Sequence, residues 1–332
     1  MKRKISIVLA SLLFAVGFAA CGEKEEQEIT VYMPDGAPAL ALAGLMAEDT
    51  ADDGVSYNVV PATAIASKVT YKEEDKNADL CVMPITAASK LLGSGEKYQM
   101  LGAVTHGNLY LIAKEGEEVS ADCSSLMGKK VGVLQINEVP GLTFKATLNK
   151  YGIPWQELTN DGIMAVDKVN LVAISGPEAV GAIDADFYMI AEPAASAQAK
   201  KGYSIVGDLQ KLYGGENGYP QAVLVAKKSL VEGKAQWVKE FVSKVEGSAE
   251  WISAASGEDI VAAVSAHMED DGAVTSLKAP LLSSAVLGRC GIYFTYAGDC
   301  KEEVEGFLNG MLAVNNKAAA IPLQEFYWEY TK

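Results

Sequence analysis

The sequence predicts an α/β protein of two lobes, each with a mostly parallel β-sheet covered by helices on both faces, and with a hinge and a cleft between the lobes. Three observations predict this class. The chain has 332 residues, and chains longer than roughly 250 to 300 residues usually form more than one core. Continuous apolar runs alternate with helical stretches rich in small residues, as in sheets that are buried on both faces. Four strand-and-helix units also recur in the same order along the chain.

The amino terminus has the layout of an export signal. Lys2, Arg3 and Lys4 precede an apolar run over residues 5–20, which ends in small residues. The run is shorter than the roughly 20 apolar residues that a membrane-spanning helix needs. We therefore expect residues 1–20 to be a signal peptide rather than a transmembrane anchor.

The motif "FAAC" at residues 18–21 resembles a bacterial lipobox. The resemblance implies cleavage before Cys21 and attachment of a lipid such as palmitate to Cys21. The protein would then be anchored on the extracytoplasmic face of the cell membrane. Residues 21–28 continue with glycine and charged residues, so we expect a flexible tether there.

The exported protein is expected to be strongly acidic. Removing the three cationic residues of the signal changes the formal net charge from −15 to −18. Such a body is a poor partner for nucleic acid or for anionic lipid headgroups. Arg289 is the only arginine that remains after the signal is removed.

The four cysteines after Cys21 leave the redox chemistry open. Cys290 and Cys300 are spaced to close a hairpin-like loop with a disulfide, which an exported protein can form. Unpaired, core-packed cysteines fit Cys81, Cys123 and this pair equally well. The sequence has no CxxC motif and no Cys/His cluster, so we expect no metal site.

The internal repeat defines the expected strands and helices. The first unit, "VYMPDGAPALALAGL" at 31–45, combines an apolar strand, a polar turn, a proline and a helix, and "VGVLQINEVPGLTFKATL" at 131–148 repeats that order. The other matched pairs are 55–69 with 169–183, 78–89 with 185–196, and 98–114 with 203–227. Four matches in register predict two related lobes whose strand-to-helix turns face a common cleft.

Two amphipathic helices are expected after the second set of units. The helix at 229–254 and the helix at 301–316 both carry apolar residues at three- and four-residue spacing. The apolar residues are Val238, Phe241, Val245, Ala249 and Ile252 in the first helix and Val304, Phe307, Leu308, Met311 and Leu312 in the second. The terminal "EFYWEY" is expected to seal an edge of the core, because large aromatic side chains dominate core burial.

Together these segments resemble the solute-binding lipoproteins of ABC importers, which have the type II periplasmic-binding-protein fold of two Rossmann-like lobes. More narrowly, the chain resembles the group that binds sulfonates, nitrate or thiamine precursors. The residues that carry the resemblance are "FAAC", "MPDGAPAL", "ADLCVMP", "THGNLYLIAK", "LMGKKVGV", "PEAVGAIDADFYMIAEP" and the late "FYW". They extend over the whole chain after the signal.

The resemblance implies a division of the chain and a mode of action. Residues 29–112 plus 224–332 would form lobe 1, and residues 113–223 would form lobe 2. In this family a small molecule binds between the lobes, hinge bending closes them, and the closed form delivers the solute to an ABC permease and its ATPase.

The matched turns supply the candidate ligand-binding residues. Each offers a hydrogen-bonding side chain or an uncovered backbone amide where a small molecule would lie. The candidates are Asp35, Gly36, Ala37, Thr63, Met83, Thr86, His106 and Asn108 in the first set of units, and Gln135, Asn137, Thr143, Gly176, Glu192, Tyr219 and Gln221 in the second.

Several candidates have a structural alternative. Asp35 also fits an Asx turn that caps the first helix, and Thr63 and Thr143 also fit helix caps. His106 also fits core packing. Glu192 precedes a proline at the end of an apolar strand, where a carboxylate needs a partner, so a ligand or hinge contact is favoured there.

The charged residues favour a neutral or cationic solute, such as a nitrogen heterocycle or an amine, over a sulfonate. Anion sites commonly use an arginine or lysine fork. Arg289 lies far along the chain from every candidate turn, and the turns carry Asp35, Glu178 and Glu192 instead. Helix N-termini can bind an anion without an arginine, so a sulfonate stays open as an alternative.

Two rival functions fit the resemblance. One is a binding module that feeds a sensor or chemoreceptor, and the other is an enzyme of the thiamine- or menaquinone-precursor type on the same fold. The export signal opposes the enzyme, and neither His106 nor His267 has a Ser or Cys nucleophile motif around it. We therefore expect a monomeric binding protein without a cofactor, a metal or a catalytic residue.

Overall fold

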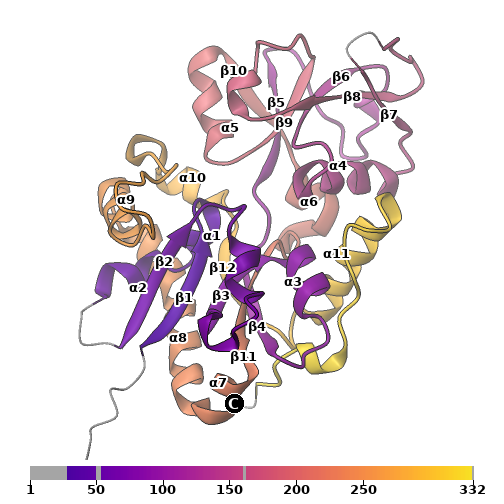
Figure 1. The fold of residues 1–332 in the computed structure, drawn as a ribbon. Helices are drawn as coiled ribbons and strands as arrows, with labels where there is room; N and C mark the ends of the chain where they lie inside the picture. The colour runs from indigo at the N-terminus through magenta and orange to yellow at the C-terminus, as the bar shows by residue number, and fades with distance from the viewer. Residues whose placement is uncertain (1–27, 50–53, 160–161, 331–332) are drawn as a thin grey trace, which may run out of the picture.

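The computed structural model describes residues 28–49, 54–159 and 162–330. The expected signal peptide at 1–20, the lipidation site Cys21 and most of the tether lie outside these residues. Two six-stranded sheets form two lobes, which lie one above the other in Figure 1. None of the helices in the described ranges is long and apolar enough to span a bilayer.

The first sheet has the strand order β12-β4-β11-β3-β1-β2. β1 pairs in parallel with β2 and β3, whereas β11 runs antiparallel to β3 and β4, and β12 runs antiparallel to β4. Its strands are β1 (Ile29–Pro34), β2 (Val55–Val60), β3 (Leu80–Pro84), β4 (Tyr98–Thr105), β11 (Ala222–Lys227) and β12 (Ile292–Tyr296).

The second sheet has the order β10-β5-β9-β6-β8-β7. The pairs β7–β8, β6–β8 and β6–β9 are parallel, and the pairs β5–β9 and β5–β10 are antiparallel. Its strands are β5 (Leu109–Lys114), β6 (Lys130–Leu134), β7 (Trp155–Glu157), β8 (Val169–Ile174), β9 (Phe187–Ala191) and β10 (Tyr203–Asp208).

The two strand orders correspond, since β2-β1-β3-β11-β4 in one sheet matches β8-β6-β9-β5-β10 in the other. The α/β class is confirmed. A mostly parallel sheet is right for the second lobe and wrong for the first, where antiparallel pairs are in the majority. Each sheet has two antiparallel pairs because the fourth repeat unit of each set splits between the sheets: β4 and β5 are consecutive in sequence but belong to different lobes, as do β10 and β11. The first sheet has a third antiparallel pair because its outer strand β12 runs antiparallel to β4, whereas β7 is parallel to β8.

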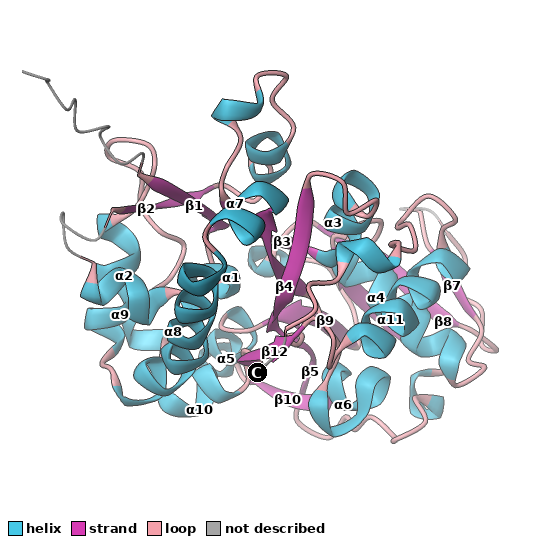
Figure 2. Ribbon diagram, turned by 90° about the horizontal axis from the view of Figure 1, so that it is seen from below, coloured by secondary structure: helices cyan, strands magenta, loops and turns pink. Residues whose placement is uncertain are grey.

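Helices cover both faces of the first sheet. One core cluster lies under α2, α8 and α9, and a second lies under α3 and α11; Figure 2 shows these two groups on either side of the sheet. The helices are α1 (Ala37–Leu40), α2 (Ala43–Glu48), α3 (Ile85–Leu92), α4 (Val139–Lys150), α5 (Ala194–Ala197), α6 (Leu209–Gly214), α7 (Lys228–Gly233), α8 (Ala235–Ala254), α9 (Gly257–Ala266), α10 (Ser284–Gly288) and α11 (Lys301–Val314).

The helix expected at 229–254 is broken into α7 and α8 at Lys234. Val238, Phe241, Val245 and Ile252 of the predicted stripe are buried. Between Val245 and Ile252 the predicted stripe residue Ala249 is only partly buried, and the buried residue is Ser248. The Ser248 hydroxyl accepts a hydrogen bond of 3.0 Å from the Gly44 amide at the start of α2. α8 therefore packs on α2 through one polar contact within an apolar face.

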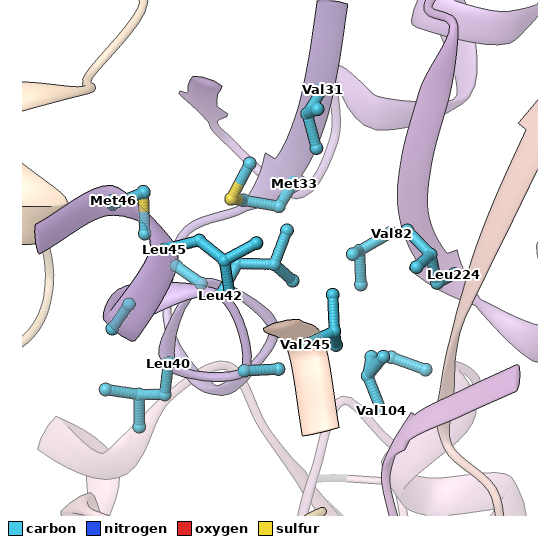
Figure 3. Close-up of a cluster of buried hydrophobic side chains, with 14 of the residues drawn as sticks. Val31, Met33, Leu40, Leu42, Leu45, Met46, Val82, Val104, Leu224 and Val245 are labelled. Carbon is cyan, nitrogen blue, oxygen red and sulfur yellow. The ribbon is translucent and has the colours of Figure 1, made fainter. Parts of the chain in front are cut away.

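The core of the first lobe joins segments that are far apart in sequence. Figure 3 shows Met33 of β1, Leu42 before α2, Val82 of β3, Leu224 of β11 and Val245 of α8 pointing toward one another. Met33, Leu42, Val82 and Leu224 have no solvent exposure. Their burial fixes the first helical layer on the sheet.

The four cysteines within the described residues are free and buried. Cys290 lies in the core cluster under α8 and α9, whereas Cys300 lies in the cluster under α3 and α11. β12 separates them, so the disulfide that the sequence left open is not formed.

Replacing Leu42 with alanine should lower the free energy of unfolding by about 2 to 5 kcal/mol, because the site is fully buried and the truncation leaves a cavity. Urea unfolding followed by circular dichroism measures this loss. Leu323, which is 58% exposed, gives the control L323A, for which we expect a change within about 0.5 kcal/mol. Equal effects of the two substitutions would contradict the packing described here.

Candidate functional site

The chain passes between the sheets twice, and the two crossings lie side by side. The first crossing is 106–108, between β4 and β5, and the second is 209–221, between β10 and β11. The Tyr219 amide donates to the His106 carbonyl (3.3 Å), and the Gln221 amide donates to the Thr105 carbonyl (2.8 Å). The lobe boundaries that the sequence indicates, near 112 and 223, fall inside β5 and β11.

His106 is packed into the first crossing. Its ring stacks on Tyr293 with centroids 3.6 Å apart, and its Nε2 lies 3.2 Å from the Thr295 hydroxyl. The residue is 5% exposed, and this burial lowers the pKa of His106 to about 4. The imidazole is therefore neutral at pH 7 and joins the crossing to β12.

Asn108 joins the start of β5 to the end of β9. Its side-chain amide donates to the Glu192 carbonyl (3.0 Å), and the Glu192 amide donates to the Asn108 carbonyl (2.8 Å). Asn108 is buried. Its amide nitrogen is thus engaged with backbone of the second lobe.

Glu192 has protein partners for its carboxylate. Oε1 accepts hydrogen bonds from Arg289 Nε (2.6 Å) and from the Ser196 hydroxyl (2.6 Å), and Oε2 accepts from the Ser196 amide (2.9 Å). The Glu192 side chain is fully buried, and that of Arg289 is about one-third exposed. Arg289 therefore does contact a candidate turn, and the inference from chain separation that it lies far from all of them is wrong.

Tyr219 and Thr143 meet the helices at the other side of the crossings. The Tyr219 ring stacks on Phe307 of α11, with centroids 4.9 Å apart, and its hydroxyl lies 3.5 Å from Gln210 Oε1. Burial raises the pKa of Tyr219 well above its usual value. Thr143 is buried within α4, where its hydroxyl donates to the Val139 carbonyl (2.7 Å), so it does not cap that helix.

Two cavities lie where the lobes meet. One, of about 480 Å³, is lined by Tyr219 of the second crossing, by α4 and α6, and by Phe307 of α11. The other, of about 250 Å³, is lined by His106 and Tyr293 and by residues of both lobes that include Lys211 and Arg289. Among the candidate residues, Tyr219 lines the first cavity and His106 lines the second.

The candidate residues of the first lobe differ in their solvent exposure and in whether their side chains already have protein partners. Asp35 accepts hydrogen bonds from the Thr275 hydroxyl (2.5 Å) and the Ser276 amide (2.7 Å), so its carboxylate holds the loop before α10. It does not cap α1. Gly36 has φ of 100°, a conformation that favours glycine, and Ala37 begins α1. Thr63 is exposed, whereas Met83 and Thr86 are buried.

The turn between β6 and α4 exposes two candidate side chains. Gln135 and Asn137 are both exposed, and Gln135 has a positive φ of 47°, which is uncommon for a residue with a side chain. Gly176 is buried beside the Glu178 carboxylate, and Gln221 is partly buried.

Lys145 supports the turn between β6 and α4, and it was not among the candidates predicted from the sequence. It is 2% exposed, and its Nζ donates to the Ile136 carbonyl (2.8 Å) and to Glu157 Oε1 (2.6 Å). The buried lysine thereby fixes the backbone of the exposed Gln135–Asn137 turn through the Ile136 carbonyl. A lysine within the apolar and small stretch at 139–148 of α4 was the available signal.

Comparisons with solved structures identify the fold. An ABC transporter from Parabacteroides distasonis is 19% identical, and the match covers 92% of this chain and 100% of that chain with a TM-score of 0.70. The periplasmic aliphatic sulphonate binding protein SsuA from Escherichia coli is 14% identical, with 92% and 93% covered and a TM-score of 0.65. This chain has the fold of periplasmic solute-binding proteins.

A third similar structure is the alkanesulfonate-binding protein SsuA from Xanthomonas axonopodis pv. citri bound to MOPS. That protein is 11% identical, and the match covers 89% of this chain and 96% of that chain with a TM-score of 0.55. No protein-family model and no curated protein sequence matches this chain. Within 28–49, 54–159 and 162–330, no group of three or more His, Cys, Asp or Glu side chains is arranged to hold a metal ion.

The buried His106 should make the folded protein less stable in mild acid. The folded pKa of about 4 lies below the unfolded value of about 6.5, so the unfolded state binds the extra proton and gains stability as the pH falls below 6.5. Between pH 7 and pH 5 we expect His106 to lower the free energy of unfolding by about 2 kcal/mol.

Urea unfolding of the wild type and of H106N at both pH values measures this contribution. The variant removes the titrating group, so its loss of stability between pH 7 and pH 5 should be smaller than that of the wild type by the same amount. Identical pH dependence of the two proteins would show that His106 titrates normally.

Proposed function

We propose that this protein captures a small molecule between its two lobes and delivers it to the permease of an ABC importer. The observation that carries the proposal is the arrangement of two matching sheets joined by adjacent crossings, which an ABC transporter structure shares over 92% of this chain. Two neighbouring crossings permit hinge bending, the usual way in which such a fold closes on a ligand.

The proposed lobes follow the division that the resemblance implies, 29–112 plus 224–332 and 113–223, but with the crossings at 106–108 and 209–221 as the hinge, so that all of β5 belongs to lobe 2 and all of β11 to lobe 1. The cavity of about 480 Å³ between the lobes supports binding of a small solute, because ligand pockets usually measure about 300 to 1,000 Å³; the cavity of about 250 Å³ is smaller than that range. Residues 1–20 act as the export signal in this proposal, and the lipid on Cys21 holds the protein beside its permease on the outer face of the membrane.

The proposed solute is neutral or cationic, such as a nitrogen heterocycle or an amine. Arg289 is engaged with Glu192, and Lys145 with Glu157, so these cations are partly neutralised by the protein itself. The exposed candidates Thr63, Gln135 and Asn137 offer neutral hydrogen-bonding groups. Such groups suit a polar uncharged ligand better than an isolated sulfonate.

A thermal-shift screen of the purified protein tests this function. A ligand that binds the folded state raises its stability by RT ln(1 + [L]/Kd), so the melting temperature should rise with one of the panels of amines, nucleobases, vitamin precursors or amino acids. A rise with sulfonates alone would contradict the proposed solute class. No rise with any panel would contradict capture of these small molecules.

Replacing Asn137 with alanine should weaken binding of the solute found in that screen by about 3- to 10-fold, the effect of losing one hydrogen bond of about 0.5 to 1.5 kcal/mol. Because Asn137 is exposed, the melting temperature of the ligand-free protein should change by only a few degrees. Calorimetric titration measures the affinity. The control is N316A, an exposed asparagine after α11, and equal affinities of N137A and N316A would remove Asn137 from the site.

A further inference from the structure

Arg289 is bound to the second lobe at both its backbone and its side chain. The Tyr110 hydroxyl of β5 donates to the Arg289 carbonyl (3.0 Å), while Arg289 Nε contacts Glu192 and Nη2 donates to the Ser196 hydroxyl (2.6 Å). The next residue, Cys290, has no exposure and belongs to the core of the first lobe. The arginine thus connects the core of one lobe to the α5 end of the other.

We propose that Arg289, Glu192 and Ser196 form an interlobe latch, which holds the two lobes together without a ligand and opens when the Glu192 carboxylate is rehydrated. The proposal rests on the division into two mobile lobes, but it does not depend on any solute. In Figure 1 the latch lies where α10 of the first lobe approaches α5 of the second.

The hydrogen bonds of Glu192 determine which contacts break when the latch opens. Both bonds from Ser196 come from the same lobe as Glu192, so they persist when the lobes separate. The bond from Arg289 crosses between the lobes. Separation therefore removes only the counter-ion, and water replaces it on a carboxylate that stays held by its own lobe.

Burial makes the latch stronger than a surface ion pair. The Glu192 side chain is fully buried in this structure, and a buried carboxylate that loses its counter-ion carries a large desolvation cost. The protein can relieve this cost by opening the lobes and hydrating Glu192, without unfolding either sheet. Loss of Arg289 should therefore change the relative position of the lobes before it changes their internal structure.

The apolar contact on the other side of the crossings joins the second crossing to the first lobe. There the Tyr213 and Tyr219 rings pack against Phe307 of α11. Apolar packing is non-directional, whereas a charge-assisted arginine–carboxylate bond has a fixed geometry. The latch is thus the contact that defines one closed position.

The test compares R289Q, R289K, E192Q and the double variant E192Q/R289Q with the wild type, all without added solute. Small-angle X-ray scattering measures the radius of gyration, and hydrogen exchange measures opening at residues 284–290 and 194–198. K97Q is the matched control, because the Lys97–Glu74 pair is largely exposed and lies within the first lobe.

We expect R289Q to have a larger radius of gyration than the wild type and exchange at both segments that is faster by roughly 100-fold, with an unchanged far-ultraviolet spectrum. R289K should lie between R289Q and the wild type, because lysine keeps the charge but loses the planar fork. E192Q/R289Q should be less open than R289Q, since it leaves no unpaired buried charge. K97Q should match the wild type.

An R289Q protein with the dimensions and exchange rates of the wild type would overturn the latch. If R289Q does not fold, the double variant decides: an E192Q/R289Q protein with the radius of gyration and exchange rates of the wild type overturns the latch, and a folded double variant that is larger and exchanges faster at both segments supports it. Because no solute is present, these outcomes are independent of the thermal-shift screen, and failure to find a ligand would not affect them.

Discussion

The hydrogen-bonded pairing of the two chain crossings is the constraint on which the rest of this structure depends. The crossings are more than 100 residues apart in sequence, yet the Tyr219 amide binds the His106 carbonyl and the Gln221 amide binds that of Thr105. Two adjacent strands of chain that leave each sheet at the same place permit rotation about one axis. They also place β11 beside β4 and β5 beside β10, so the hinge and the antiparallel half of each sheet are set by the same connection.

The buried ionisable side chains near the crossings and the β6–α4 turn are either paired with an opposite charge or neutral. The body is acidic, yet its only described arginine lies against a buried carboxylate, and its buried lysine is placed against a backbone carbonyl and Glu157. His106 avoids the cost of a buried charge by staying neutral. At the β6–α4 turn the exposed candidate side chains are the neutral amides of Gln135 and Asn137, next to the exposed Glu138, and the proposed neutral or cationic solute fits this set.

The sequence allowed the order of the strands to be anticipated better than the contacts of the candidate residues. Apolar runs and the repeated strand–turn–helix units mark local structure, so β1 with α1 and β6 with α4 were predictable. The split of the fourth units was expected only from the resemblance, which placed a lobe boundary within each of them, because a strand gives no local signal of which sheet it joins. The contact between Arg289 and Glu192 spans 97 positions; the sequence indicated that Glu192 needs a partner, but only the fold shows that the partner is the arginine.

Helix α11 loses helical stability at two glycines, and one of them is required by a neighbouring side chain. Gly306 and Gly310 lie within this helix, where each glycine costs about 1 kcal/mol relative to alanine. At Gly310 the reason is spatial, because an added Cβ would lie 2.0 Å from the Tyr213 hydroxyl of the second crossing. A side chain there would push Tyr213 away and separate the aromatic contact around Phe307. The weaker helix is thus retained for the fit of α11 against the second crossing, and the geometry of the hinge takes precedence over local stability at this position.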